Sequence, residues 1–336
     1  MNIRKSLIAA AAGAGVLSLA LATLPLAQAD PVGPPTYRAL AGVGSDTTQS
    51  LMNALAEVVT DGGTKVIGSY DAIGSPTITT KDPAVNPKCK DIVRPNGSTG
   101  GRNALQASLV AGDGCYQFAR SSSSRGTYES PIDMVWVPFA TDALTFAVRS
   151  DGDVSRELTK AQLIAIFKCQ VPAVQPALVQ VDSGTRGSWL KYVGITEDEI
   201  AAGSYPCLVP EADGGTFPGK LPQEHDGREL KKNQVMPYSA AVYQAQMYGT
   251  APDRRGRAVP GVIDGVVPTI INTQFSGVRD MFNIIPADKA DDPTSLEYKV
   301  FVGPDSLLCK AKPAINLQGF GELVDASKCG DTSSRS

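Results

Sequence analysis

The chain has 336 residues, of which 42% are hydrophobic, 6% are aromatic and 19% are charged. This composition is typical of a globular protein with a buried core, and it excludes a disordered tail and a fibre. The length favours two domains. The formal net charge is −3, which argues against a surface that binds duplex nucleic acid.

Residues 1–29 have the layout of a secretory signal. Two basic residues precede a long apolar run, and Ala27 and Ala29 suit the cleavage site, so we expect the mature chain to begin at Asp30. No later stretch approaches the roughly 20 apolar residues that a membrane span needs, and no cysteine directly follows the signal to accept a lipid. A secreted or periplasmic protein without a membrane span after cleavage is expected.

Six cysteines follow the signal, and an even number in an exported chain indicates disulfides. Pairing of neighbours along the chain predicts three local loops, although 15 pairings are possible. The predicted bridges are Cys89–Cys115, Cys169–Cys207 and Cys309–Cys329. A zinc site is not expected, because no two cysteines are two to four residues apart and His225 is the only histidine. No metal or other cofactor is therefore predicted.

The single histidine also limits catalysis. A serine hydrolase of the usual kind needs a histidine beside its nucleophile, and His225 lies in a Pro- and Gly-rich stretch, 203–233, that is predicted to be an exposed loop. The chain has no Gly-x-Ser-x-Gly elbow, phosphate-binding P-loop or Gly-x-Gly-x-x-Gly dinucleotide motif. We therefore expect a protein that is not an enzyme.

Hydrophobic periodicity predicts alternating strands and helices. Taken along the chain, strands are expected at 37–43, 65–70, 115–119, 134–139, 144–148, 178–181, 278–285 and 298–302. Helices are expected around 51–59, 97–110, 158–167, 183–193, 240–247 and 317–324. The alternation predicts a mostly parallel sheet covered on both faces, with ligands at the carboxyl ends of its strands.

Three of the predicted helices begin in turns rich in Ser, Thr and Gly, at 44–48, 97–101 and 182–187, and a serine run occupies 121–124. A helix start presents unpaired N–H groups and a partial positive charge, which suits an anion. A single such turn is more often only a cap. Three turns and a serine run together predict a site that binds a small oxyanion through neutral donors.

Five short motifs follow one another along the chain: 42–47 (GVGSDT), 97–101 (GSTGG), 118–122 (FARSS), 158–167 (LTKAQLIAIF) and 182–185 (DSGT). The chain resembles in this respect the phosphate-binding protein of ABC-type phosphate importers, a periplasmic binding protein of type II. The matches cover roughly residues 40 to 200. The resemblance implies a two-lobed α/β fold with a ligand cleft between the lobes. The first lobe would comprise 30–140 and 275–336, and the second 141–274.

The resemblance also implies ligand-binding residues, which are Asp46, Thr47, Ser98, Ser183, Gly184 and Thr185. We add Ser122 and Arg186 to the expected site, at or near two positions where this chain departs from the family. Ser122 stands where the family has an aspartate, and the family's arginine before the Ser-Gly-Thr turn is missing. Arg186 or Arg120 would then supply the positive charge, and Asp46 would replace the lost acceptor.

The function implied is that of a secreted, monomeric solute-binding protein. It would capture inorganic phosphate or a similar oxyanion for ABC-type uptake, with a transporter permease as partner. Two other functions stay open from the residues. One is an extracellular phosphatase that uses a serine or threonine nucleophile in the same site, and the other is a surface interaction protein that has kept the fold only.

Overall fold

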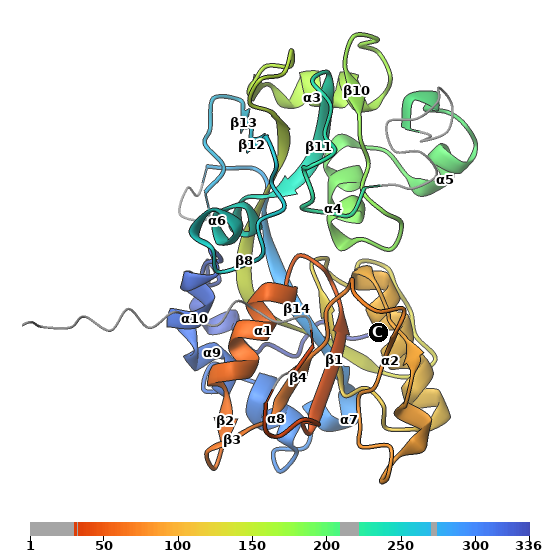
Figure 1. The fold of residues 1–336 in the computed structure, drawn as a ribbon, viewed down its shortest axis with the longest axis vertical. Helices are drawn as coiled ribbons and strands as arrows, with labels where there is room; N and C mark the ends of the chain where they lie inside the picture. The colour runs from red at the N-terminus through yellow and green to blue at the C-terminus, as the bar shows by residue number, and fades with distance from the viewer. Residues whose placement is uncertain (1–29, 32, 209–221, 270–273) are drawn as a thin grey trace, which may run out of the picture.

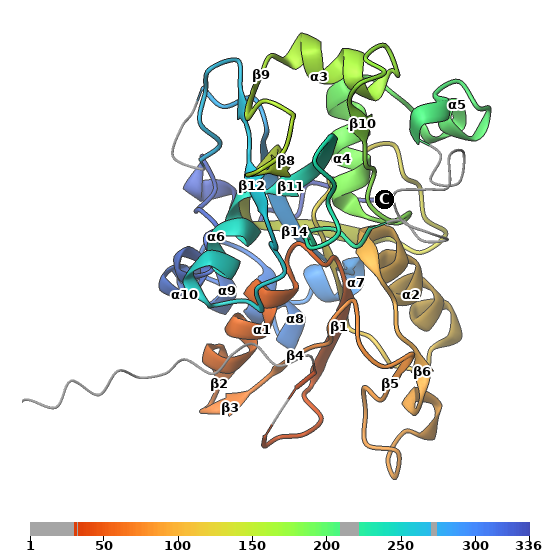
Figure 2. The same cartoon turned by 45° about the horizontal axis from the view of Figure 1, so that its top comes forward.

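The structure is a computed structural model that describes residues 30–31, 33–208, 222–269 and 274–336. The predicted signal, 1–29, and the middle of the predicted loop at 203–233 lie outside the described residues. Figures 1 and 2 show two lobes, one below the other, with two long strands running between them.

One mixed sheet extends through both lobes (Figure 1). Its strands, in spatial order, are β10 (Gln175–Pro176), β11 (Gln234–Ser239), β8 (Met134–Arg149), β14 (Val278–Pro286), β7 (Phe118–Ser121), β1 (Leu40–Gly44) and β4 (Ile67–Ser69), with β12 (Ala258–Pro260) also on β8. The pairs β1–β4, β1–β7 and β10–β11 are parallel, and the other pairs are antiparallel. The expectation of a mostly parallel sheet was therefore wrong, because β14 brings the chain back between β7 and β8.

Shorter strand pairs decorate the two lobes: β2 (Thr60–Asp61) with β3 (Thr64–Lys65), β5 (Thr77–Ile78) with β6 (Ile92–Val93), and β9 (Glu157–Leu158) with β13 (Val262–Ile263). The helices of the first lobe are α1 (Gln49–Val58), α2 (Gly97–Ala111), α7 (Ala287–Ala290), α8 (Leu296–Phe301), α9 (Leu307–Lys310) and α10 (Lys312–Leu317). Those of the second are α3 (Lys160–Phe167), α4 (Gly184–Val193), α5 (Glu197–Ala201) and α6 (Ala240–Tyr248).

Capping residues explain where the second lobe's helices begin. Thr159 starts α3 with a complete capping box, and Thr196 does the same for α5. The Ser183 hydroxyl accepts a hydrogen bond from the Arg186 N–H at the start of α4, and Ser239 caps α6 in the same way. The chain thus encodes these helix starts locally.

Five predicted elements differ in the structure. The two strands expected at 134–139 and 144–148 are one continuous strand, β8. Residues 178–181 form no strand. The segment expected as a strand at 298–302 lies largely in helix α8, because Ser295 caps it. The helix expected at 317–324 instead ends at Leu317, because Gly319 has a φ of +79°.

Separate hydrophobic clusters form the cores of the two lobes. Phe118, Phe301 and Phe320 belong to a first-lobe cluster, and Phe167 and Trp189 to a second-lobe cluster. Along β8 the change from one cluster to the other comes between Ala140 and Ala143. Ala241 and Val242 of α6 pack in the first-lobe cluster, so this helix lies where the lobes join.

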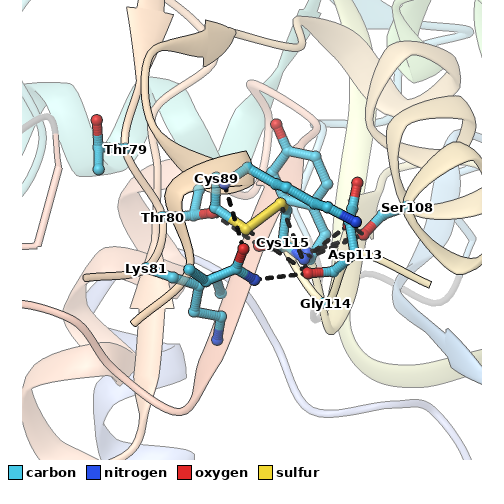
Figure 3. The surroundings of a disulfide bond; sticks show 12 residues. Thr79, Thr80, Lys81, Cys89, Ser108, Asp113, Gly114 and Cys115 are labelled. Atoms are coloured by element: carbon cyan, nitrogen blue, oxygen red, sulfur yellow. Dashed lines mark hydrogen bonds between the residues drawn. A yellow bond between two sulfur atoms is a disulfide. The ribbon is translucent and has the colours of Figure 1, made fainter. Parts of the chain in front are cut away.

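All three predicted disulfides are present: Cys89–Cys115, Cys169–Cys207 and Cys309–Cys329. Figure 3 shows the first, where Thr80 donates to the Cys115 carbonyl at 2.8 Å and its N–H donates to the Cys89 carbonyl at 3.1 Å. Each bridge joins two segments of the same lobe, so none of them ties one lobe to the other.

Candidate functional site

The structure brings the three Ser/Thr/Gly turns together at the junction of the lobes. The turn between β1 and α1 belongs to the first lobe, and the start of α4 belongs to the second. The hydroxyls of Thr47 and Thr185 are 3.0 Å apart across this junction. The Thr99 N–H, in the first turn of α2, donates to the Asp182 carbonyl at 3.0 Å. These contacts join the lobes directly.

Two serines of the first lobe face the start of α4. The Ser98 hydroxyl accepts a hydrogen bond from the Ser122 N–H at 3.0 Å and lies 3.3 Å from the Ser122 hydroxyl. Gly184 packs on both, because a Cβ added there would lie 2.3 Å from Ser98 Oγ and 2.5 Å from Ser122 Oγ. Only glycine allows this approach.

The predicted site residues are closed off from solvent, since none of their side chains is more than 6% exposed: Asp46, Thr47, Ser98, Ser122, Ser183, Thr185 and Arg186. The Thr47 and Thr185 hydroxyls contact each other across the junction.

The helix ends at this junction favour negative charge. Helices α1, α2 and α4 have no acidic residue in their first turns. At the start of α1 the hydroxyls of Ser45 and Thr48 are buried, and neither has a hydrogen-bond partner among the described residues. Unpaired helix N–H groups and spare hydroxyls are donors that suit an oxyanion.

A positive charge reaches the junction from β14. Nη2 of Arg279 donates to the Thr185 hydroxyl at 3.0 Å, and Nη1 donates to the Ser122 carbonyl at 3.3 Å. The Asp142 carboxylate on β8 accepts from Nε and Nη2 of the same guanidinium, at 3.0 and 2.8 Å. Asp142 is fully buried and also accepts from the Ser239 hydroxyl at 2.6 Å. The guanidinium is therefore held in one place.

The two arginines singled out from the sequence bind elsewhere. The Arg186 guanidinium donates to both Glu197 carboxylate oxygens, at 2.6 and 2.8 Å, and to the Val179 carbonyl. The Arg120 side chain is fully buried beneath the first turn, where it donates to the Ser45 carbonyl and the Ser69 hydroxyl. Burial lowers the Arg120 pKa to about 10. Both side chains brace the turns that they adjoin.

Carboxylates surround this part of the junction. Asp71 lies near Arg120 and accepts a hydrogen bond from the Asn53 amide at 2.7 Å. Burial raises the Asp71 pKa to about 7. The Glu224 carboxylate accepts from the Ser183 hydroxyl at 2.6 Å. Asp46 faces His225, with 3.7 Å between Oδ2 and Nδ1.

His225 is only 2% exposed, so the expectation of an exposed loop around it was wrong. The loop folds inward because the His225 carbonyl accepts hydrogen bonds from the Tyr238 hydroxyl and the Gln246 amide. Sequence reasoning also missed Arg279 and Asp142. One sequence signal could have found them, because both residues lie in or beside apolar strands. A charged side chain in such a strand is buried only when it is paired, so it indicates a partner elsewhere in the chain.

In the described ranges, no group of three or more His, Cys, Asp or Glu residues is placed to hold a metal ion. The same residues include no helix with the length and apolarity of a membrane span.

Comparison with solved structures finds proteins with a similar fold. A Clostridium perfringens protein, assigned as a phosphate ABC transporter substrate-binding protein and solved with bound phosphate, matches with a TM-score of 0.50 and 14% identity over 84% of this chain and 99% of the other. An ABC-type phosphate transport receptor from Vibrio cholerae matches with a TM-score of 0.50 and 18% identity over the same shares. The chain has the two-lobed fold of these binding proteins.

The resemblance seen in the turn motifs is thus confirmed for the fold. No protein-family model matches the sequence, and no curated protein sequence does. At such low sequence identity, the similarity shows the fold alone. The ligand has to be inferred from the residues of the site.

Proposed function

We propose that this protein captures a small oxyanion, inorganic phosphate, between its two lobes outside the cytoplasm and delivers it to an ABC transporter permease. The fold supports a solute-binding role, because the two proteins it matches are a transporter's substrate-binding protein and a transport receptor. The first of them was solved with bound phosphate.

One observation carries the choice of an oxyanion. The Arg279 guanidinium contacts Thr185 of one lobe and Ser122 of the other, at the point where three helix starts converge. Charge-assisted hydrogen bonds from a guanidinium, together with hydroxyls and helix N–H groups, match the several oxygens of phosphate. Asp142 neutralises Arg279 when no ligand is bound, so the site does not need a basic surface.

Strands β8 and β14 are the hinge in this proposal. They cross between the lobes, and their pairing shifts register where Ala140 pairs with Met281 and Pro138 pairs with Phe282. The bulge at Phe139 interrupts the ladder and eases a local bend. Bending at this bulge would separate Thr47 from Thr185 and admit the anion.

The site gives no support to a phosphatase. Hydrolysis by a serine or threonine nucleophile needs a base within hydrogen-bond reach. The hydroxyls of Ser98, Ser122 and Thr185 contact one another or Arg279, while His225 faces Asp46. Ser183 does donate to the Glu224 carboxylate at 2.6 Å, but its oxygen also accepts the Arg186 N–H and so caps α4. We therefore propose capture and release without chemistry.

Native mass spectrometry of the purified protein tests the ligand directly, because it detects an anion carried through purification. Calorimetric titration with phosphate and with sulfate at fixed ionic strength then measures the preference. Phosphate binding that is tighter than sulfate binding supports the proposal. Tighter sulfate binding overturns the choice of ligand, and binding of neither anion favours a protein that has kept only the fold. Turnover in a colorimetric phosphatase assay would instead establish an enzyme.

A further inference from the structure

The side chain of Asn96 bonds across the junction and leaves its own helix, α2, without a cap. Asn96 stands at the N-cap position with the extended backbone of a capping residue (φ −122°, ψ 135°), yet its side chain makes no capping hydrogen bond. Asparagine is among the residues preferred at this position. By comparison, a serine or threonine hydroxyl caps each of α3, α4, α5, α6, α8 and α9. A suitable cap in the right conformation is therefore engaged elsewhere.

Asn96 is bonded to Gln223 of the second lobe. Nδ2 of Asn96 donates to Oε1 of Gln223 at 2.9 Å, and Nε2 of Gln223 donates back to Oδ1 of Asn96 at 3.3 Å. The second lobe fixes the segment around Gln223 through Gln180. The Gln180 N–H donates to the Pro222 carbonyl at 3.0 Å, and its Oε1 accepts from the Glu224 N–H at 2.8 Å. The reciprocal amide pair therefore forms only when the lobes come together.

The second lobe also takes the backbone donor that Asn96 is placed to cap. An N-cap side chain accepts from the N–H two or three residues further on, which in α2 belongs to Ser98 or Thr99. The Thr99 N–H donates to the Asp182 carbonyl at 3.0 Å. Gly97 allows this approach, because a Cβ there would lie 2.3 Å from the same carbonyl oxygen. Both halves of the missing cap thus have partners in the other lobe.

We propose that Asn96 exchanges partners as the lobes move, pairing with Gln223 when they are closed and capping α2 through the Thr99 N–H when they are open. Separation of the lobes removes Gln223 and Asp182 together. It leaves Oδ1 of Asn96 and the Thr99 N–H within one helical turn of each other, each in need of a partner. Both states then satisfy both groups.

The exchange gives Asn96 and Gln223 a part in anion capture, and this step rests on the proposed function. The amide pair favours the closed state that holds the anion, and the cap favours the open state that releases it. Neither bond contributes much net free energy, so the two keep the hinge balanced and the anion decides its position. Asn96 and Gln223 are therefore positioning residues that set how long the anion stays.

The cap is tested in a protein whose lobes are held apart. Gly184→Leu places a large side chain where even an added Cβ would lie 2.3 Å from Ser98 Oγ, so the closed junction cannot form. In that background, NMR measures hydrogen exchange of the Thr99 backbone amide without added anion, with Asn96 kept or replaced by Ser or Ala. The first N–H groups of a helix have no partner within it, so in the open protein a cap protects this amide.

We expect the Thr99 amide to exchange about fivefold faster in Asn96→Ala than with Asn96, as loss of a cap of ordinary strength implies. Asn96→Ser should restore the protection, because serine is also a good N-cap and cannot reproduce the reciprocal amide pair. Equal exchange rates with asparagine and alanine overturn the exchange of partners. This measurement needs no phosphate binding.

The amide pair is tested by the rate at which the full mature chain, otherwise unaltered, releases radiolabelled phosphate into excess unlabelled phosphate. Gln223→Ala should release it about tenfold faster, because two hydrogen bonds of the closed state are lost, while the association rate stays close to that of wild type. The control Gln175→Ala removes an amide contact with Gln234 inside the second lobe and should release phosphate as wild type does.

An unchanged release rate in Gln223→Ala overturns the role of the amide pair. Absence of phosphate binding in wild type defeats the proposed function alone, and the Thr99 exchange rates then still decide whether Asn96 caps the open state.

Discussion

Arg279 and Asp142 form a buried ion pair across the two strands that join the lobes. The two residues are register partners on β14 and β8, and Nη2 lies 2.8 Å from Oδ2. The pair therefore stands on the proposed hinge itself, while the guanidinium contacts one residue of each lobe. A buried pair adds little net stability, but removal of one partner leaves the other charge uncompensated. We infer that the main role of this ion pair is to bind the anion, not to stabilise the fold.

Arg279→Lys tests the role of the guanidinium while it keeps the charge. Lysine cannot reproduce the planar fork that reaches Asp142, Thr185 and Ser122 together, so phosphate affinity should fall by about ten- to a hundredfold, equivalent to roughly 1.5–3 kcal/mol. The matched control is Arg186→Lys, because the Arg186 guanidinium is bound to Glu197. Calorimetric titration checks both. Equal losses in the two variants would argue against Arg279 as the anion's partner.

Gly184→Ala tests closing of the lobes. The added methyl would lie 2.3 Å from Ser98 Oγ, so the junction must open or distort, at a cost of about 1–3 kcal/mol. The free energy of phosphate binding should become less favourable by the same amount. Small-angle scattering with phosphate should show a larger radius of gyration than that of wild type. Gly187→Ala, in the same helix, would add a methyl that meets nothing within 4 Å in the described part of the chain, and it should behave as wild type. A fully compact, tightly binding Gly184→Ala protein would show that this contact does not form in solution.

Asp46→Asn tests selectivity between oxyanions. Phosphate at neutral pH carries a proton that a buried carboxylate can accept, whereas sulfate offers none and meets like charge. The variant should bind phosphate more weakly, by about 1–3 kcal/mol, and should narrow the gap to sulfate because an amide can donate. Titration of both anions at fixed ionic strength measures this. Unaltered phosphate affinity would remove Asp46 from the site.

Asp71→Asn tests the charge buried behind the junction. Burial raises the Asp71 pKa to about 7 in the fold, from an ordinary value of 3.8. The folded state thus binds more protons than the unfolded state between these values, so this residue lowers stability as the pH rises from about 4 to 7. The asparagine keeps the bond from Asn53 and lacks the charge. It should unfold as wild type does near pH 4 and be more stable above pH 7, by an amount on the order of 1–3 kcal/mol.

Urea unfolding of both proteins at pH 4.5 and pH 8 checks this prediction. If the free energy of unfolding changes equally with pH in both proteins, Asp71 is well solvated in the native state.

Features that depend on neighbours along the chain were predictable from the sequence. The start of α4 follows from Ser183, whose hydroxyl accepts the Arg186 N–H, because capping needs only residues within one helical turn. The disulfide pairs were predicted correctly because each closes a loop within one lobe. The order of the turn motifs was enough to predict the fold that the solved structures confirm.

Tertiary structure alone decided which charges enter the site. Arg279 and Asp142 are 137 residues apart, and Asp46 and His225 come from different lobes. Local pattern cannot show such pairs, because a charge is buried only where a distant partner compensates it. The antiparallel return of β14 between β7 and β8 brings Arg279 to the junction. The sequence by itself determined the helix starts that can bind an anion, and long-range pairing decided which charges face it.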